Sequence, residues 1–178
     1  MKKSVLAFVL ALVFVSPSFS QVIQTKEASK TNLPAVNIKT LDGQTINTSE
    51  IQNDGKPIII SFWAMWCVNC LKELNAIQEV YPEWQKETGV KLIAISIDDA
   101  KSVDKVKPFV NGKNWDFEIY LDENKDFYRA LNINQIPHTF LINGNREIVW
   151  QHVTYTEGSE EDLFKLVKKI IAGEEITE

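Results

Sequence analysis

The chain has 178 residues, of which 44% are hydrophobic and 24% charged, and its formal net charge is −5. This length and apolar content fit one globular domain with its own core and argue against general disorder. The excess of acidic residues argues against a nucleic-acid-binding protein, which needs a positive surface to neutralise phosphates. The two cysteines are too few for a disulfide-rich scaffold or for a four-cysteine zinc site.

Residues 1–20 have the three-part pattern of a secretory signal peptide. Two lysines at positions 2–3 precede an unbroken apolar run at 5–15, and small residues follow at Ser18 and Ser20. The run is shorter than the roughly 18–20 residues that span a bilayer, so a cleaved signal is favoured and a retained membrane anchor is the alternative. We therefore expect an extracytoplasmic, periplasmic protein.

The remaining chain reads as a polar linker at 21–33, a single domain at 34–173 and a C-terminal tail at 174–178. Pro82 is expected to kink or interrupt the first long helix, and Ser159 to cap the last one. The order of elements favours an α/β fold with a central mixed β-sheet flanked by helices. The predicted elements, in chain order, are a hairpin at 35–40 and 45–48, a strand at 58–63, a helix at 67–88, a strand at 90–97, a helix at 100–110, a strand at 118–121, a helix at 122–131, a hairpin at 138–142 and 147–152, and a helix at 160–172.

Cys67 and Cys70 lie where the first buried strand meets the first long helix. A spacing of three places the two Cα atoms about 5–6 Å apart on one helical turn, within disulfide range. Cys67 is expected at the helix N-terminus, where free N–H groups and the helix dipole stabilise a thiolate, whereas Cys70 lies one turn inside. We therefore predict that Cys67 attacks a substrate disulfide and that Cys70 resolves the mixed disulfide.

Two other roles are open to this cysteine pair. A purely structural disulfide adds little stability here, because the chain-entropy contribution grows with the length of the closed loop. A metal site would need further ligands, and no metal or other cofactor is expected. The alternative function is a copper carrier or non-catalytic binding module that uses the two thiols and His138, since soft thiolates bind Cu(I).

Two segments resemble the thioredoxin superfamily. Residues 63–70 (WAMWCVNC) resemble its active-site segment, and residues 133–142 (INQIPHTFLI) resemble the segment that carries its cis-proline. The resemblance implies a three-layer thioredoxin-like fold and a cis peptide bond before Pro137. It also implies that Ile136 and Pro137 bind the substrate chain, with Trp66 as a further contact.

Within the superfamily the chain is most similar to exported thiol–disulfide oxidoreductases of the TlpA/ResA type. The leading hairpin resembles their N-terminal extension, residues 99–121 resemble their central insertion, and Glu73 follows Cys70 by three, as their tuning carboxylate does. Ser61 stands where thioredoxin has a buried aspartate, so Glu73 is either the active-site carboxylate or a solvated helix residue paired with a lysine.

The resemblance further implies a monomeric reductase of protein disulfides. Electrons would come from a thiol-reductant donor in the membrane, and cytochrome c maturation and extracytoplasmic thiol repair are the candidate pathways. Val68 and Asn69 replace the residues usual between the two cysteines, which leaves the reduction potential and the direction of net transfer open.

Overall fold

The structure is a computed structural model that describes residues 31–176. The predicted signal peptide and most of the predicted linker lie outside these residues. Between residues 31 and 176, no helix combines the length and hydropathy needed to cross a membrane.

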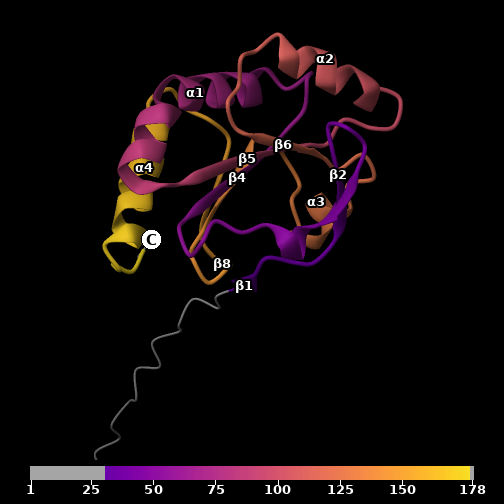
Figure 1. Cartoon of the computed structure of the whole chain (residues 1–178). Helices are drawn as coiled ribbons and strands as arrows, with labels where there is room; N and C mark the ends of the chain where they lie inside the picture. Colours follow the sequence, from indigo (N-terminus) through magenta and orange to yellow (C-terminus); the bar gives the residue numbers. More distant parts are fainter. Residues whose placement is uncertain (1–30, 177–178) are drawn as a thin grey trace, which may run out of the picture.

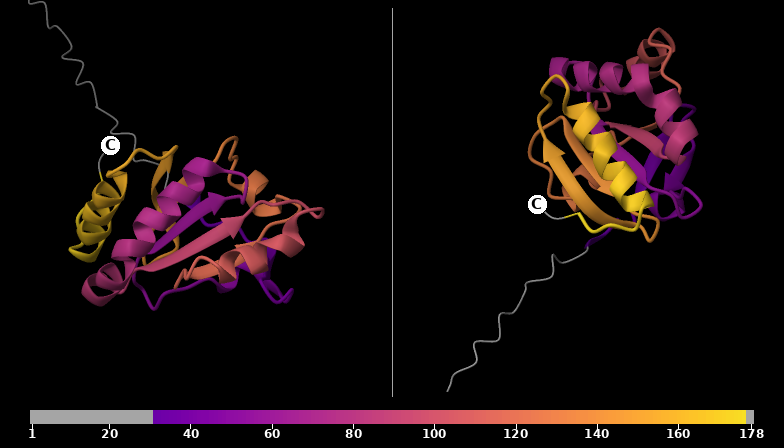
Figure 2. Two further views of the ribbon diagram at one scale, coloured as in Figure 1. Left: turned by 90° about the horizontal axis from the view of Figure 1, so that it is seen from above. Right: turned by 90° about the vertical axis from the view of Figure 1, so that its left-hand side faces the viewer.

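The part of the chain that the structure describes forms one eight-stranded mixed sheet with helices on both faces (Figures 1 and 2). The strand order is β1-β8-β7-β4-β5-β6-β2-β3, with β4, β5 and β6 parallel and the other pairs antiparallel. The strands are β1 (Thr31–Asn32), β2 (Asn37–Thr40), β3 (Thr45–Asn47), β4 (Ile58–Trp63), β5 (Lys91–Ser96), β6 (Glu118–Leu121), β7 (His138–Ile142) and β8 (Glu147–Val153). The helices are α1 (Val68–Thr88), α2 (Val106–Asn111), α3 (Asp126–Ala130) and α4 (Ser159–Ile171), with 3-10 turns at Thr48–Glu50 and Val103–Lys105.

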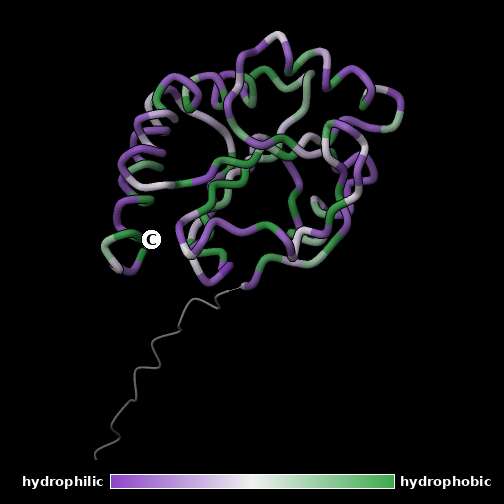
Figure 3. The backbone as a smooth tube through the Cα atoms, viewed as in Figure 1, coloured by the Kyte–Doolittle hydropathy of each residue, from purple (hydrophilic) through white to green (hydrophobic). Residues whose placement is uncertain are grey.

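The central strand β4 is buried along its whole length, as its run of β-branched and aromatic residues predicts. Alternate side chains face opposite layers, because successive residues of a strand point to opposite faces. The ring of Phe62 packs 5.3 Å from that of Phe127 on α3, whereas the neighbouring Ser61 hydroxyl bonds Glu73 on α1. Figure 3 shows the hydrophobic residues concentrated along the central strands. The predicted mixed sheet between helical layers is confirmed.

The predicted N-terminal hairpin is also confirmed, and it extends the sheet. Strands β2 and β3 pair with each other, and β2 continues into the main sheet by pairing with β6. Two residues assigned to the linker, Thr31 and Asn32, pair with β8 at the opposite edge, and Leu33 is buried. The folded domain therefore begins before Pro34.

Helix α1 runs without a break from Val68 to Thr88, so of the two outcomes expected at Pro82, a kink or an interruption, the interruption is absent. Figure 1 and the right view of Figure 2 show the helix bending along its length. Proline removes one helical hydrogen bond, and the buried residues on either side of it, Tyr81 and Trp84, hold the helix to the core. Near its C-terminal end the Trp84 ring stacks on Phe164 of α4, with centroids 4.7 Å apart and planes at 1°.

Two helix starts differ from the prediction. In place of the helix expected at 100–110, a 3-10 turn begins at Val103 and α2 begins at Val106, because Asp99 accepts the backbone N–H of Lys101 and the hydroxyl of Ser102 and holds a turn there. Ser159 lies inside α4 and does not cap it. Gly158, at φ +91°, occupies the N-cap position, a left-handed conformation that glycine adopts without steric cost.

Candidate functional site

Cys67 and Cys70 form a disulfide at the N-terminus of α1, with their Cα atoms 5.3 Å apart. Cys67 is the N-cap residue, as predicted, and the backbone N–H of Cys70 points at its sulfur from 3.2 Å. No acidic residue lies in the first turn of the helix. A thiolate on Cys67 would therefore receive a hydrogen bond and the positive end of the helix dipole, with no carboxylate on that turn to oppose it.

The two sulfurs differ in their access to solvent. Cys67 retains 8% exposure, whereas Cys70 is fully buried, with its sulfur 4.0 Å from the carbonyl oxygen of Phe62. Trp66 and Val68, the chain neighbours of Cys67, are 67% and 65% exposed. The accessible sulfur thus lies between two large exposed apolar side chains, which offer apolar contact area beside it.

The Ile136–Pro137 peptide bond is cis, as the resemblance implies. It precedes β7, and His138 at the start of β7 pairs with Phe62 near the end of β4, so this loop and the cysteine turn lie at the same end of the sheet. The carbonyl of Pro137 accepts the N–H of Thr154. Within residues 31–176 the backbone of Ile136 has no hydrogen-bond partner, which leaves its N–H and C=O available to an incoming chain.

The Glu73 side chain is buried beneath the cysteine pair, and the reading of it as a solvated residue paired with a lysine is wrong. The hydroxyls of Ser61 on β4 and Thr139 on β7 each donate a hydrogen bond to its carboxylate at 2.8 Å. Burial raises the pKa of Glu73 to about 7, against the opposing effect of these two hydrogen bonds. The sequence holds a signal for this burial, because Cys70, Glu73 and Ile77 recur at helical spacing on the buried face of α1.

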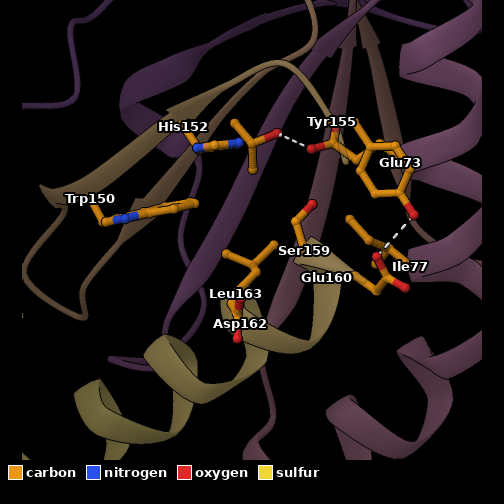
Figure 4. A pocket seen from close by; sticks show the side chains of 10 residues that line it. Glu73, Ile77, Trp150, His152, Tyr155, Ser159, Glu160, Asp162 and Leu163 are labelled. Carbon is orange, nitrogen blue, oxygen red and sulfur yellow. Dashed lines mark hydrogen bonds between the residues drawn. The ribbon is translucent and has the colours of Figure 1, made fainter. Parts of the chain in front are cut away.

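A pocket of about 190 Å³ opens beside Glu73 between α1, β8 and α4 (Figure 4). Glu73, Ile77 and Thr139 line it from α1 and the sheet. The other lining groups include His152, Tyr155 and Glu160, which sequence reasoning did not single out. His152 lies in β8 and the other two follow that strand, all more than 70 positions from Glu73, so no local pattern marks them.

The turn that leads into Cys67 is fixed by the end of the neighbouring strand. The Asp98 carboxylate accepts the backbone N–H of Met65 at 3.0 Å and the Ser96 hydroxyl at 2.9 Å. The carbonyl of Trp63 accepts the N–H of Ile97. Asp98 therefore positions the active-site turn.

The structure does not bring His138 to the cysteine pair. His138 stacks on Phe140, with ring centroids 4.5 Å apart, and its Nε2 lies 3.1 Å from Gln151. Thr139, the next residue of β7, points toward Glu73 on α1. Because neighbouring residues of a strand point to opposite faces, His138 points away from the layer that contains α1. Among residues 31–176 no group of three or more His, Cys, Asp or Glu side chains could hold a metal ion. The copper-carrier alternative thereby loses its third ligand.

Similar proteins agree with this geometry. ResA, a thiol–disulfide oxidoreductase of Bacillus thuringiensis, is 31% identical over 133 residues, 75% of this chain and 73% of its own. ResA of Halalkalibacterium halodurans is 29% identical over 94% of both chains. The solution structure of a thioredoxin-like protein from Porphyromonas gingivalis is 51% identical, with a TM-score of 0.71 over 79% of this chain and 92% of that one.

A more distant structure shows the same fold. The crystal structure of a putative thiol:disulfide interchange protein DsbE from Chlorobium tepidum is 19% identical, with a TM-score of 0.69 over 80% of this chain and 96% of that one. The AhpC/TSA family profile matches residues 29–151. With a CxxC disulfide at the start of α1 and a cis-proline at the same end of the sheet, the chain belongs to the AhpC/TSA family and is a thioredoxin-like thiol–disulfide oxidoreductase of the ResA type.

Proposed function

We propose that this protein reduces protein disulfides by dithiol–disulfide exchange. The Cys67 thiolate attacks one sulfur of a substrate disulfide, which forms a mixed disulfide and releases one substrate thiolate. The Cys70 thiolate then attacks the Cys67 sulfur, which restores the Cys67–Cys70 disulfide and releases the second substrate thiolate. Two electrons pass to the substrate, and the released thiolates take up protons from water.

The observation that carries this proposal is the difference between the two sulfurs. Cys67 is the N-cap, keeps some exposure and receives the N–H of Cys70, whereas Cys70 is fully buried. The attacking thiol must be accessible and stabilised as a thiolate, while the resolving thiol must be kept from solvent and from other oxidants. The geometry supports these roles in that order.

Glu73 is the proposed proton acceptor for Cys70. It lies one helical turn after Cys70 and its carboxyl is buried, with a pKa of about 7 that suits proton transfer near neutral pH. The buried Cys70 thiol must lose its proton before it can attack the mixed disulfide. An ionised Glu73 is the carboxylate on the buried face of α1 that can take this proton, directly or through one water molecule.

Trp66, Ile136 and Pro137 are the proposed substrate contacts. The exposed ring of Trp66 offers apolar area beside the accessible sulfur, and the unpaired backbone groups of Ile136 can extend a strand of the substrate. Their role as contacts is supported by the pairing of His138 with Phe62, because the start of β7 then lies at the end of the sheet that carries Cys67. These contacts are to backbone and apolar groups, so they suit protein disulfides of varied sequence.

The proposed location is extracytoplasmic, supported by the signal-peptide pattern of residues 1–20. In an oxidising compartment a reductase needs electrons from elsewhere, so a thiol donor in the membrane is the proposed partner, and the working form is a monomer. Cell fractionation and mass determination of the mature N-terminus test the location, and a cytoplasmic protein with an intact N-terminus would overturn it.

A redox titration of the Cys67–Cys70 couple tests the direction of transfer. A potential near or below about −270 mV supports a reductase, whereas one near about −120 mV would make the protein an oxidant. Cys67→Ser is expected to abolish reduction of insulin disulfides, and Cys70→Ser to trap mixed disulfides. Disulfide reduction at the wild-type rate by Cys67→Ser would overturn the mechanism.

A further inference from the structure

The pocket beside the redox site contains a second carboxylate. Glu160, in the first turn of α4, lines the same pocket as Glu73, although the two residues come from different helices. Figure 4 shows both side chains around this pocket. Glu160 is half-buried, so its charge is screened less than that of a carboxylate on the open surface.

Glu160 is held in one place by two hydrogen bonds. The Tyr155 hydroxyl donates to its Oε2 at 2.9 Å and the Gly158 N–H donates to the same oxygen at 3.1 Å. Figure 4 draws the bond to Tyr155 as a dashed line. Burial and the bond to Glu160 raise the pKa of Tyr155 to about 12, so its hydroxyl remains a donor across the working pH range. The N-terminus of α4 also favours a negative charge at this position.

We propose that Glu160 is a positioning residue of the redox site: it sets the proton affinity of Glu73 across the pocket, and Tyr155 holds it there. A fixed negative charge disfavours ionisation of a second carboxyl nearby. Glu160 thus keeps Glu73 protonated to a higher pH than burial and the two hydrogen bonds would without this charge. The consequence for catalysis rests on the proposed function, because it requires Glu73 to exchange a proton during turnover.

The other charged groups around Glu73 do not replace Glu160. Asp162 on α4 also lines the pocket, but it is paired with Lys165 at 2.7 Å, which offsets its charge. His152 on β8 is exposed at the pocket wall, and it contributes no carboxylate to the pocket. Of the charged groups, Glu160 is the one that raises the pKa of Glu73, in addition to burial.

The test is the titration of the Glu73 side chain in the oxidised protein, labelled with ¹³C at glutamate carboxyl groups. Its resonance is identified by its loss in Glu73→Gln. Glu160→Gln keeps an oxygen that can accept from both Tyr155 and Gly158 but removes the charge. The titration midpoint is expected to fall by about half a pH unit, and Tyr155→Phe, which frees Glu160, should lower it by less.

Glu161→Gln is the matched control, because it removes one negative charge from the same turn of α4 at an exposed position that does not line the pocket. It should leave the midpoint unchanged. Repeating the series with His152→Gln removes the imidazole from the pocket wall formed by β8. Equal midpoints in wild type, Glu160→Gln and Glu161→Gln would overturn the proposal.

The titration also separates this proposal from the proposed function. If Glu73→Gln leaves the pH profile of disulfide exchange unchanged, the catalytic role of Glu73 is wrong. The midpoints of the labelled carboxyl would still decide whether Glu160 controls its ionisation.

Discussion

The Ser61 hydroxyl donates a hydrogen bond of 2.8 Å to the Glu73 carboxylate, which joins the central strand to the helix that carries both cysteines. In thioredoxin, which this chain resembles, the strand position of Ser61 holds the buried carboxylate itself. Here the strand supplies only a hydroxyl, and the carboxylate reaches the same layer from α1. The charge is therefore attached to the element that also carries Cys70.

Glu73 should make the protein less stable as the pH rises. Its pKa is raised from 4.5 in the unfolded chain to about 7 in the fold, so the native state retains a proton that the unfolded state loses between these values. The free energy of unfolding is expected to fall by about 3 kcal/mol across this interval because of Glu73 alone.

Urea denaturation of the oxidised protein at about pH 5 and about pH 8 measures this loss. Glu73→Gln is the control, since it keeps an acceptor for the two hydroxyls but cannot ionise. Its stability should change less between the two pH values than that of the wild type. An identical change in both proteins would show that Glu73 is ionised throughout.

Removing either hydroxyl that bonds Glu73 should raise the pKa of this carboxyl further. Ser61→Ala and Thr139→Val each delete a donor that favours the ionised form, so the Glu73 titration should move to higher pH. Each change should also cost about 1–2 kcal/mol near pH 8, where the carboxylate is charged and loses a buried partner. Carboxyl ¹³C titration and urea denaturation measure the two effects, and a downward move of the midpoint would contradict the assignment of donor and acceptor.

Trp66→Ala should weaken substrate binding without changing the redox centre. The ring is 67% exposed, so its loss should leave the melting temperature and the reduction potential unchanged. The KM for a protein disulfide is expected to rise by roughly tenfold, as for other exposed aromatic contacts. Ile171→Ala is a matched control, because Ile171 is also a large exposed side chain but lies at the far end of α4. Equal KM values in the two variants would show that Trp66 does not contact the substrate.

Gly144→Ala should destabilise the fold strongly. A Cβ atom at Gly144 would lie 2.0 Å from the backbone oxygen of Gly55, which side-chain adjustment cannot relieve. The expected loss is about 2 kcal/mol or more. Gly112→Ala is the control, because its Cβ would meet only the Phe109 oxygen at 3.5 Å, and it should change stability by less than about 0.5 kcal/mol. Thermal unfolding measures the stability of both variants. Equal melting temperatures would contradict the close approach of Gly144 to the backbone of Gly55.

The sequence was sufficient for the features that depend on local pattern. The spacing of Cys67 and Cys70, the apolar run before them and the turn signals of each hairpin predict the cysteine pair and most of the sheet, because each of these is encoded within a few positions. The resemblance to the thioredoxin superfamily added the cis bond before Pro137, which no local pattern distinguishes from a trans one.

The sequence was insufficient where distant segments meet. The partner of Glu73 on β7, Thr139, is 66 positions away, so the hydrogen bond that this carboxylate accepts there could not be predicted from the residues around Glu73. The same holds for Tyr155 and Glu160, which reach the pocket only after the last hairpin has paired with the sheet. The late start of α2 followed from the side chain of Asp99, which competes with the helix for backbone hydrogen bonds.

The stack between Trp84 and Phe164 connects α1 and α4, the two helices that carry the pocket carboxylates Glu73 and Glu160. Glu73 precedes Trp84 by three turns of α1, and Glu160 precedes Phe164 by one turn of α4. This aromatic contact touches neither carboxylate, yet it fixes how the two helices lie against each other. A change in the size of either ring is therefore expected to shift α4 against α1 and to change the distance between Glu73 and Glu160, while every residue around the disulfide stays the same.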